Sequence, residues 1–150
     1  MKRFARSVTG FSFIFASACA PAPAADASLY ERLGGYDAIA GVTDDFLGRL
    51  VADTAIKPYF EGLPDSVMKR IRQHVVDQLC EASGGPCFYV GKSMKDAHAT
   101  LEITPAVWQL AVSHLEATFG KFALPSREQN EVLALVGPMK ADIVAGGSQQ

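Results

Sequence analysis

Residues 71–103, IRQHVVDQLCEASGGPCFYVGKSMKDAHATLEI, decide the fold of this chain. This stretch contains His74 and His98, two of the three histidines, on either side of the break Gly84-Gly85-Pro86. A continuous helix would not survive that break, because glycine and proline both disfavour helix interiors. A helix, a glycine-rich turn and a second short helix can therefore bring the two imidazole rings to face each other across a gap.

The helix that ends at this break shows one mixed face. Six residues recur at helical spacing, and five of them surround a single histidine: Ile71, His74, Val75, Gln78, Leu79 and Ala82. Pro64 precedes this central helix and Asp65 is expected to cap it. After the break, Ser93 can cap a short helix that contains Met94 and His98. The histidines therefore belong to two separate helices.

The flanking segments also read as helices. Ser28 and Glu31 predict a capping box for a short helix over residues 29–33, and a longer helix follows from Asp37. Its apolar residues Ile39, Val42, Phe46, Leu50 and Val51 predict one buried face, with Leu47 at the edge. Thr104-Pro105 predicts the start of another helix, Ser126 and Gln129 a capping box for the last one, and Pro138 a kink. No run alternates as a strand would, so the sequence predicts an all-α fold.

Bulk composition supports one folded domain. The chain has 150 residues, with 49% hydrophobic and 20% charged, which favours a buried core over disorder. The net charge of −2 gives no indication of nucleic-acid binding. No uninterrupted apolar stretch reaches the roughly 18 residues that a transmembrane helix needs.

The first 24 residues resemble an export signal. Lys2, Arg3 and Arg6 precede an apolar run over residues 8–20, and Ala22-Pro23-Ala24 fits a cleavage site between small residues. We expect residues 1–24 to be removed, residues 25–150 to form the domain, and the mature protein to be periplasmic. Two alternatives remain: lipid anchoring through Cys19 after Ala-Ser-Ala, and a retained N-terminal helix.

Export changes how the other two cysteines are interpreted. Cys80 and Cys87 flank the Gly-Gly-Pro turn, and in an oxidising compartment they can close a small loop. Two free thiols are the alternative. No Cys-x-x-Cys-His motif occurs, so c-type haem attachment is not indicated.

Two histidines on facing helices suit an iron cofactor. Haem iron commonly takes a neutral imidazole as its axial ligand, in a flat apolar slot. His98 suits that role, and the slot can be formed by Leu47, Phe60, Ile71 and Val75.

Several motifs together resemble the truncated haemoglobins, group I. They are SLYERLGG at 28–35, DDFLGRL at 44–50, YF at 59–60, GGPCFYVG at 84–91 and SMKDAH at 93–98. The resemblance covers residues 28 to about 143. It implies a two-over-two helical sandwich around b-type haem and the binding of diatomic ligands: oxygen, nitric oxide or carbon monoxide.

The resemblance also implies residue roles. His98 matches the proximal iron ligand, and His74 matches a histidine that in some members binds iron from the distal side. The remaining positions match haem contacts: Phe60 stacks on the haem, Tyr89 and Met94 pack on its proximal side, and Ile71 and Val75 line the distal pocket. Leu47 stands where tyrosine is common. Because leucine cannot donate a hydrogen bond to bound oxygen, we expect weaker oxygen retention than in tyrosine-bearing relatives.

Two other functions remain open at this point. The first is a redox haem protein with His74 and His98 both on iron, which would transfer electrons from a donor protein or turn over peroxide or nitrogen oxides. The second is a haem-free helical module that holds zinc or a partner through His74, His98 and Cys80 or Cys87, although their spacing fits no common zinc pattern.

Overall fold

The structure is a computed structural model that describes residues 27–144. The expected export signal at 1–24 and the lipid-anchoring alternative at Cys19 lie outside the described residues. Within residues 27–144 the chain is helical and contains no strand. The elements are α1 Leu29–Arg32, α2 Gly35–Ala52, η1 Lys57–Tyr59, α3 Asp65–Ala82, α4 Met94–His98, α5 Pro105–Lys121, α6 Ser126–Val136, η2 Gly137–Met139 and α7 Lys140–Ile143, where η marks a 3₁₀ helix.

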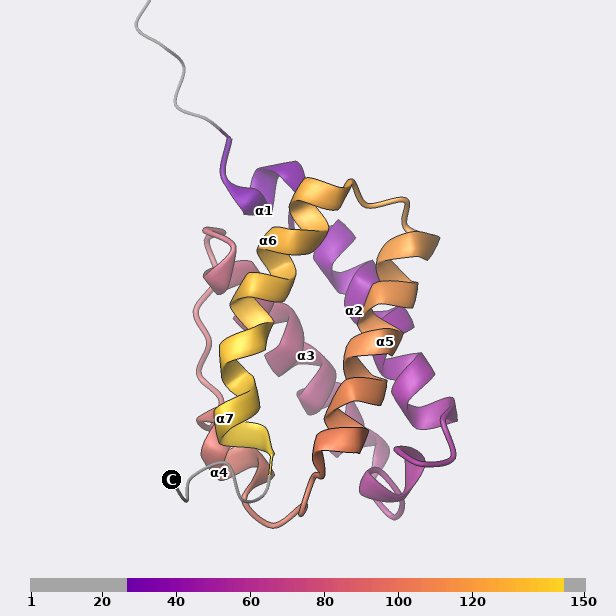
Figure 1. The fold of residues 1–150 in the computed structure, drawn as a ribbon. Helices are drawn as coiled ribbons and strands as arrows, with labels where there is room; N and C mark the ends of the chain where they lie inside the picture. Colours follow the sequence, from indigo (N-terminus) through magenta and orange to yellow (C-terminus); the bar gives the residue numbers. More distant parts are fainter. Residues whose placement is uncertain (1–26, 145–150) are drawn as a thin grey trace, which may run out of the picture.

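The four longest helices form two layers. In Figure 1, α5 and α6 cross in front of α2 and α3, and α2 contacts both α3 and α5. The short helix α4 lies at one end against α7, and a loop along the side of the molecule leads to it from the end of α3. This two-over-two arrangement confirms the predicted fold. No helix within residues 27–144 is both long enough and apolar enough to cross a membrane.

Three predicted helix starts are confirmed by their caps. The Ser28–Glu31 capping box is present at α1, with the Glu31 side chain accepting from the Ser28 backbone. The Ser93 hydroxyl accepts from the Asp96 backbone at α4, and Thr104 does the same for Val107 at α5. Each cap satisfies a backbone N–H that has no partner inside the helix.

Three predicted boundaries are wrong in detail. Helix α2 begins at Gly35, because Gly34 in the left-handed conformation already reverses the chain, and Asp37 lies inside the first turn. At α3 and α6 the extended prolines Pro64 and Pro125 precede the helix, so Asp65 and Ser126 are first helical residues without a capping bond.

In the first turn of α6, the Gln129 side chain donates to the Leu124 carbonyl instead of completing a capping box. Helix α6 ends at Val136, and the chain continues as the 3₁₀ turn that contains Pro138. This confirms the predicted interruption at that proline.

The central helix α3 packs against α2 through a different edge than expected. Its fully buried residues are Val76 and Cys80, which form a cluster with Ile39 and Ala40 of α2. The predicted stripe that contains His74 is only partly buried, and Ala82 is exposed. Within the stripe, Leu79 and Ile71 pack against the buried clusters that contain α2 residues, but neither is itself fully buried.

An ionic network joins α1 to α6. The Arg32 Nε atom donates to Glu128 Oε1 at 2.9 Å, and the same guanidinium also pairs with Glu131. Glu128 is 7% exposed, and the guanidinium beside it holds the pKa of its carboxyl below the usual value. This network keeps the N-terminal helix against the end of the second layer.

Candidate functional site

His98 is held in one orientation by its own helix. It is the last residue of α4, and its Nδ1 atom lies 2.8 Å from the Met94 carbonyl oxygen. A carbonyl can only accept, so Nδ1 carries the proton and donates it. The lone pair is then on Nε2, and the ring is half-buried. This arrangement suits a histidine that binds a metal through Nε2, because ligand histidines usually donate their other N–H to a carbonyl or carboxylate.

The predicted apolar slot is partly assembled. Leu47, 8% exposed, lies in a buried cluster with Leu50 and Ile56, and Phe60 and Ile71 pack against this cluster. Leu47 is thus buried rather than at the edge of its face. Three predicted slot residues, from α2, the turn after η1 and α3, therefore meet in one region. Val75 is half-buried on α3, one residue after His74.

His74 lies in the middle of α3 against the ring of Tyr89. The two ring centroids are 5.8 Å apart and the planes cross at 76°, an edge-to-face contact. The Nδ1 atom of His74 is buried and has no hydrogen-bond partner. The imidazole of His74 therefore lacks the support that the Met94 carbonyl gives to His98.

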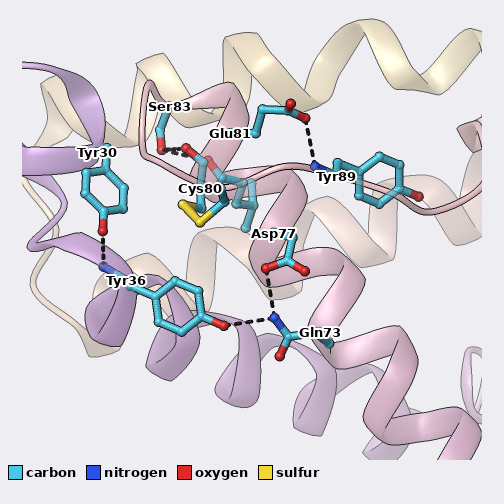
Figure 2. The surroundings of a disulfide bond; sticks show 10 residues. Tyr30, Tyr36, Gln73, Asp77, Cys80, Glu81, Ser83 and Tyr89 are labelled. Carbon is cyan, nitrogen blue, oxygen red and sulfur yellow. Dashed lines mark hydrogen bonds between the residues drawn. A yellow bond between two sulfur atoms is a disulfide. The ribbon is translucent and has the colours of Figure 1, made fainter.

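A disulfide closes the loop between the two histidine-bearing helices. Cys80 and Cys87 are bonded, with their Cα atoms 5.8 Å apart (Figure 2). Ser83, beside this bridge, accepts through its carbonyl from the Tyr30 backbone at 2.9 Å. Farther along, the backbone N–H of Tyr89 donates to Glu81 at 3.2 Å, as Figure 2 shows. The alternative of two free thiols is thereby excluded.

Comparison with known proteins identifies the family. The sequence profile of the bacterial-like globins matches residues 28–145. The chain is a bacterial-like globin. It is 32% identical over 120 residues to the group 1 truncated haemoglobin GlbN of Mycolicibacterium paratuberculosis, which covers 80% of this chain and 86% of that protein. It therefore belongs with the group 1 truncated haemoglobins.

Other similar proteins extend the match in sequence and in structure. Group 1 truncated haemoglobin LI410 of Chlamydomonas moewusii is 28% identical over 147 residues, covering 97% of this chain and 84% of that protein. The 2/2 haemoglobin of Synechococcus sp. PCC 7002, solved with covalently attached haem, superposes with a TM-score of 0.71 at 27% identity, over 79% of this chain and 98% of its own. The truncated haemoglobin of Tetrahymena pyriformis has a TM-score of 0.72 at 24% identity, over 79% and 98%, and shows the shared fold.

The donor set of this globin fits haem better than zinc. Both sulfurs of Cys80 and Cys87 are used in the disulfide, so neither can be a zinc ligand. Within residues 27–144, no group of three or more His, Cys, Asp or Glu side chains is placed to hold a metal ion. An imidazole held in one orientation, as His98 is, is instead a common axial ligand of haem iron. The disulfide therefore contradicts a zinc site that uses Cys80 or Cys87, and membership of the globin family favours haem over a haem-free module.

The third histidine has a structural role. The Nε2 atom of His114 on α5 lies 2.7 Å from Asp53 Oδ2 at the end of α2. His114 lowers the pKa of that carboxyl, and the pair joins the two layers away from the disulfide loop.

Sequence reasoning missed the contact between Tyr89 and His74. By resemblance, Tyr89 was expected beside the haem together with Met94. The structure places the Tyr89 ring against His74, and Met94 supplies the carbonyl for His98. The expected haem contacts of Tyr89 and Met94 stay predictions. Burial raises the pKa of the Tyr89 hydroxyl, which donates to the Lys92 carbonyl at 2.6 Å. His74 and Tyr89 lie on either side of the disulfide loop, so no helical periodicity in the sequence indicates that their rings are in contact.

Proposed function

We propose that this globin binds b-type haem through Nε2 of His98 and takes up a diatomic gas reversibly: oxygen, nitric oxide or carbon monoxide. The observation that carries the proposal is the hydrogen bond from His98 Nδ1 to the Met94 carbonyl, which fixes both the tautomer and the ring orientation. Haem bound there would supply an iron that can bind the gas. Phe60 and the other apolar side chains exclude water from the cofactor.

The side chains that would line the distal pocket are mainly apolar. Leu47 is buried among leucine and isoleucine side chains, and Ile71 and Val75 follow it on α3. None of these three side chains can donate a hydrogen bond to a polar ligand. Retention of oxygen should therefore be weaker than with a distal tyrosine, which argues against tight oxygen storage and against efficient nitric-oxide dioxygenation.

His74 supports a second candidate function. If its imidazole coordinates iron when no gas is bound, the iron has two histidine ligands and can pass electrons from a donor protein or turn over peroxide or nitrogen oxides. The unpartnered Nδ1 of His74 favours a weaker ligand than His98, because nothing fixes its tautomer. A gas can then displace it, so that coordination by His74 is reversible.

Optical spectra of the purified protein test both candidates. Reconstitution with one equivalent of haemin should give a Soret band, and the ferrous form should bind carbon monoxide reversibly. Sharp low-spin bands that His74→Ala abolishes would establish the two-histidine form, whereas a high-spin ferrous spectrum in the wild type would exclude it. Absence of haem binding would refute the proposed function itself.

Export to the periplasm remains part of the proposal. The support is the Cys80–Cys87 disulfide, because such bonds persist in oxidising compartments and are rare in the cytosol. Mass spectrometry of protein recovered from the periplasm tests it. Cleavage after Ala24 is expected, a lipid on Cys19 would establish anchoring instead, and an intact N-terminus in the cytoplasmic fraction would contradict export.

A further inference from the structure

The disulfide has one fixed side and one side that can move. Cys80 is 0% exposed and lies in the cluster with Ile39, Ala40 and Val76. Cys87 is partly exposed and is carried by the loop rather than by a helix. When the bond is broken, the two sulfurs must separate to van der Waals distance. The displacement must therefore be taken up by Cys87 and the residues that follow it.

The loop is tightly packed at two glycines. A Cβ at Gly85 would lie 2.7 Å from the Cys80 sulfur and 2.4 Å from the ring of Tyr30, so the backbone rests directly on the bridge. A Cβ at Gly91 would lie 2.4 Å from the ring of Tyr89. Because the Tyr89 ring lies directly against the backbone at Gly91, a shift of the loop at this point displaces that ring.

The ring of Tyr89 is in turn the aromatic partner of His74. Tyr89 lies two residues after Cys87, and its edge-to-face contact lies on the histidine whose Nδ1 has no hydrogen bond. Packing against Tyr89 therefore restricts the orientation of the His74 ring but does not fix its tautomer. A bridge between Cys80 and Cys87 restricts Tyr89, and Tyr89 restricts the imidazole.

We propose that the Cys80–Cys87 disulfide, acting through Tyr89, positions His74 for iron, so that thiol–disulfide exchange controls distal coordination. This inference rests on the proposed function, and Tyr89 is a positioning residue in it. The bridged form holds the imidazole in few rotamers and favours coordination, because less conformational entropy is lost on binding. The dithiol form releases the loop and leaves iron more open to gas.

The exchange is a two-electron reduction by a dithiol. A thiolate of the reductant attacks the more accessible sulfur, that of Cys87, and the S–S bond breaks to release the Cys80 thiolate. The second thiol of the reductant then resolves the mixed disulfide. The reductant ends as a disulfide, and both cysteines end as thiols after taking up two protons.

Ferric holoprotein variants provide the first test. Cys87→Ser removes the bridge and leaves the buried Cys80 side chain in place, whereas Gly91→Ala displaces the Tyr89 ring with both cysteines intact. Each should lower the ratio of six- to five-coordinate iron by about fivefold, the size of a modest coupling between sites. Phe88→Ala is the matched control, because that neighbouring aromatic is 80% exposed. It should leave the ratio unchanged.

Nuclear Overhauser effects provide a readout independent of iron coordination. In the ferrous carbonmonoxy form, the cross-peak between the rings of Tyr89 and His74 should be strong with the bridge intact and weak after treatment with dithiothreitol. Thiol counting confirms reduction. The inference would be overturned if neither Cys87→Ser nor Gly91→Ala changed iron coordination or the cross-peak, or if the wild-type iron were five-coordinate. Normal haem uptake in these proteins would still support the proposed function. Loss of haem uptake in His98→Gly is the separate test of the latter.

Discussion

Replacing Leu47 by tyrosine should convert this globin into one that retains oxygen. Leu47 is 8% exposed and packs with Leu50 and Ile56, so a larger ring costs about 1–3 kcal/mol of stability through overpacking. Its hydroxyl adds a donor on the distal side. A hydrogen bond to a strongly polar acceptor contributes about 1.5–3 kcal/mol. At about 1.4 kcal/mol per factor of ten, oxygen release should slow by roughly 10- to 100-fold.

Leu47→Phe is the matched control for this prediction. It introduces the same ring and the same overpacking but no hydroxyl, so the ratio of the two variants isolates the hydrogen bond. The assay is stopped-flow displacement of oxygen by carbon monoxide on the ferrous protein, with circular dichroism to confirm folding. Equal release rates for the tyrosine and phenylalanine variants would refute the account of the distal side.

Three further predictions concern stability, each measured as the free energy of unfolding in urea. Phe119→Ala should cost about 3–5 kcal/mol, because this ring is 1% exposed in the cluster of α5 and α6; a cost below 1 kcal/mol would contradict the core assignment. Thr104→Ala should cost about 1 kcal/mol through loss of the cap on α5, and Thr104→Ser should restore most of it. The pKa of Glu128 is lowered by Arg32 from its ordinary value of 4.5, so the carboxylate stabilises the fold above that pH and the contribution is lost as pH falls below it. In Arg32→Met the free energy of unfolding should therefore fall less steeply as pH is lowered below 4.5, and an unchanged pH dependence would contradict this.

Much of the fold follows from local sequence signals. The Gly84-Gly85-Pro86 break, the capping residues Ser28 and Ser93, and the periodicity of α2 each depend on residues close together in the chain, so they could be predicted from the sequence. Two boundary errors came from polar residues that follow a proline. Pro64 and Pro125 adopt the extended backbone that precedes a helix, which leaves the next residue helical and unable to cap.

Less of the site could be predicted from the sequence. Which edge of α3 is buried depends on where α2 crosses it, so Val76 and Cys80 were not distinguished from the stripe beside them. The disulfide depends on a Cα separation of 5.8 Å that spacing along the chain cannot supply. The contact of Tyr89 with His74 depends on that same loop path. The role predicted for His98 came from the resemblance of the motif at 93–98, and its hydrogen bond to the Met94 carbonyl, one helical turn away, was not part of that prediction.

The central claim is that His98 holds the haem iron, and His98→Gly tests it most directly. His114→Gly is the matched control, because it removes a histidine that pairs with Asp53 in another part of the fold. After reconstitution with haemin and gel filtration, His98→Gly should retain little haem, free imidazole should restore its Soret band, and His114→Gly should retain haem normally. Full haem content and an unchanged spectrum in His98→Gly would contradict the account.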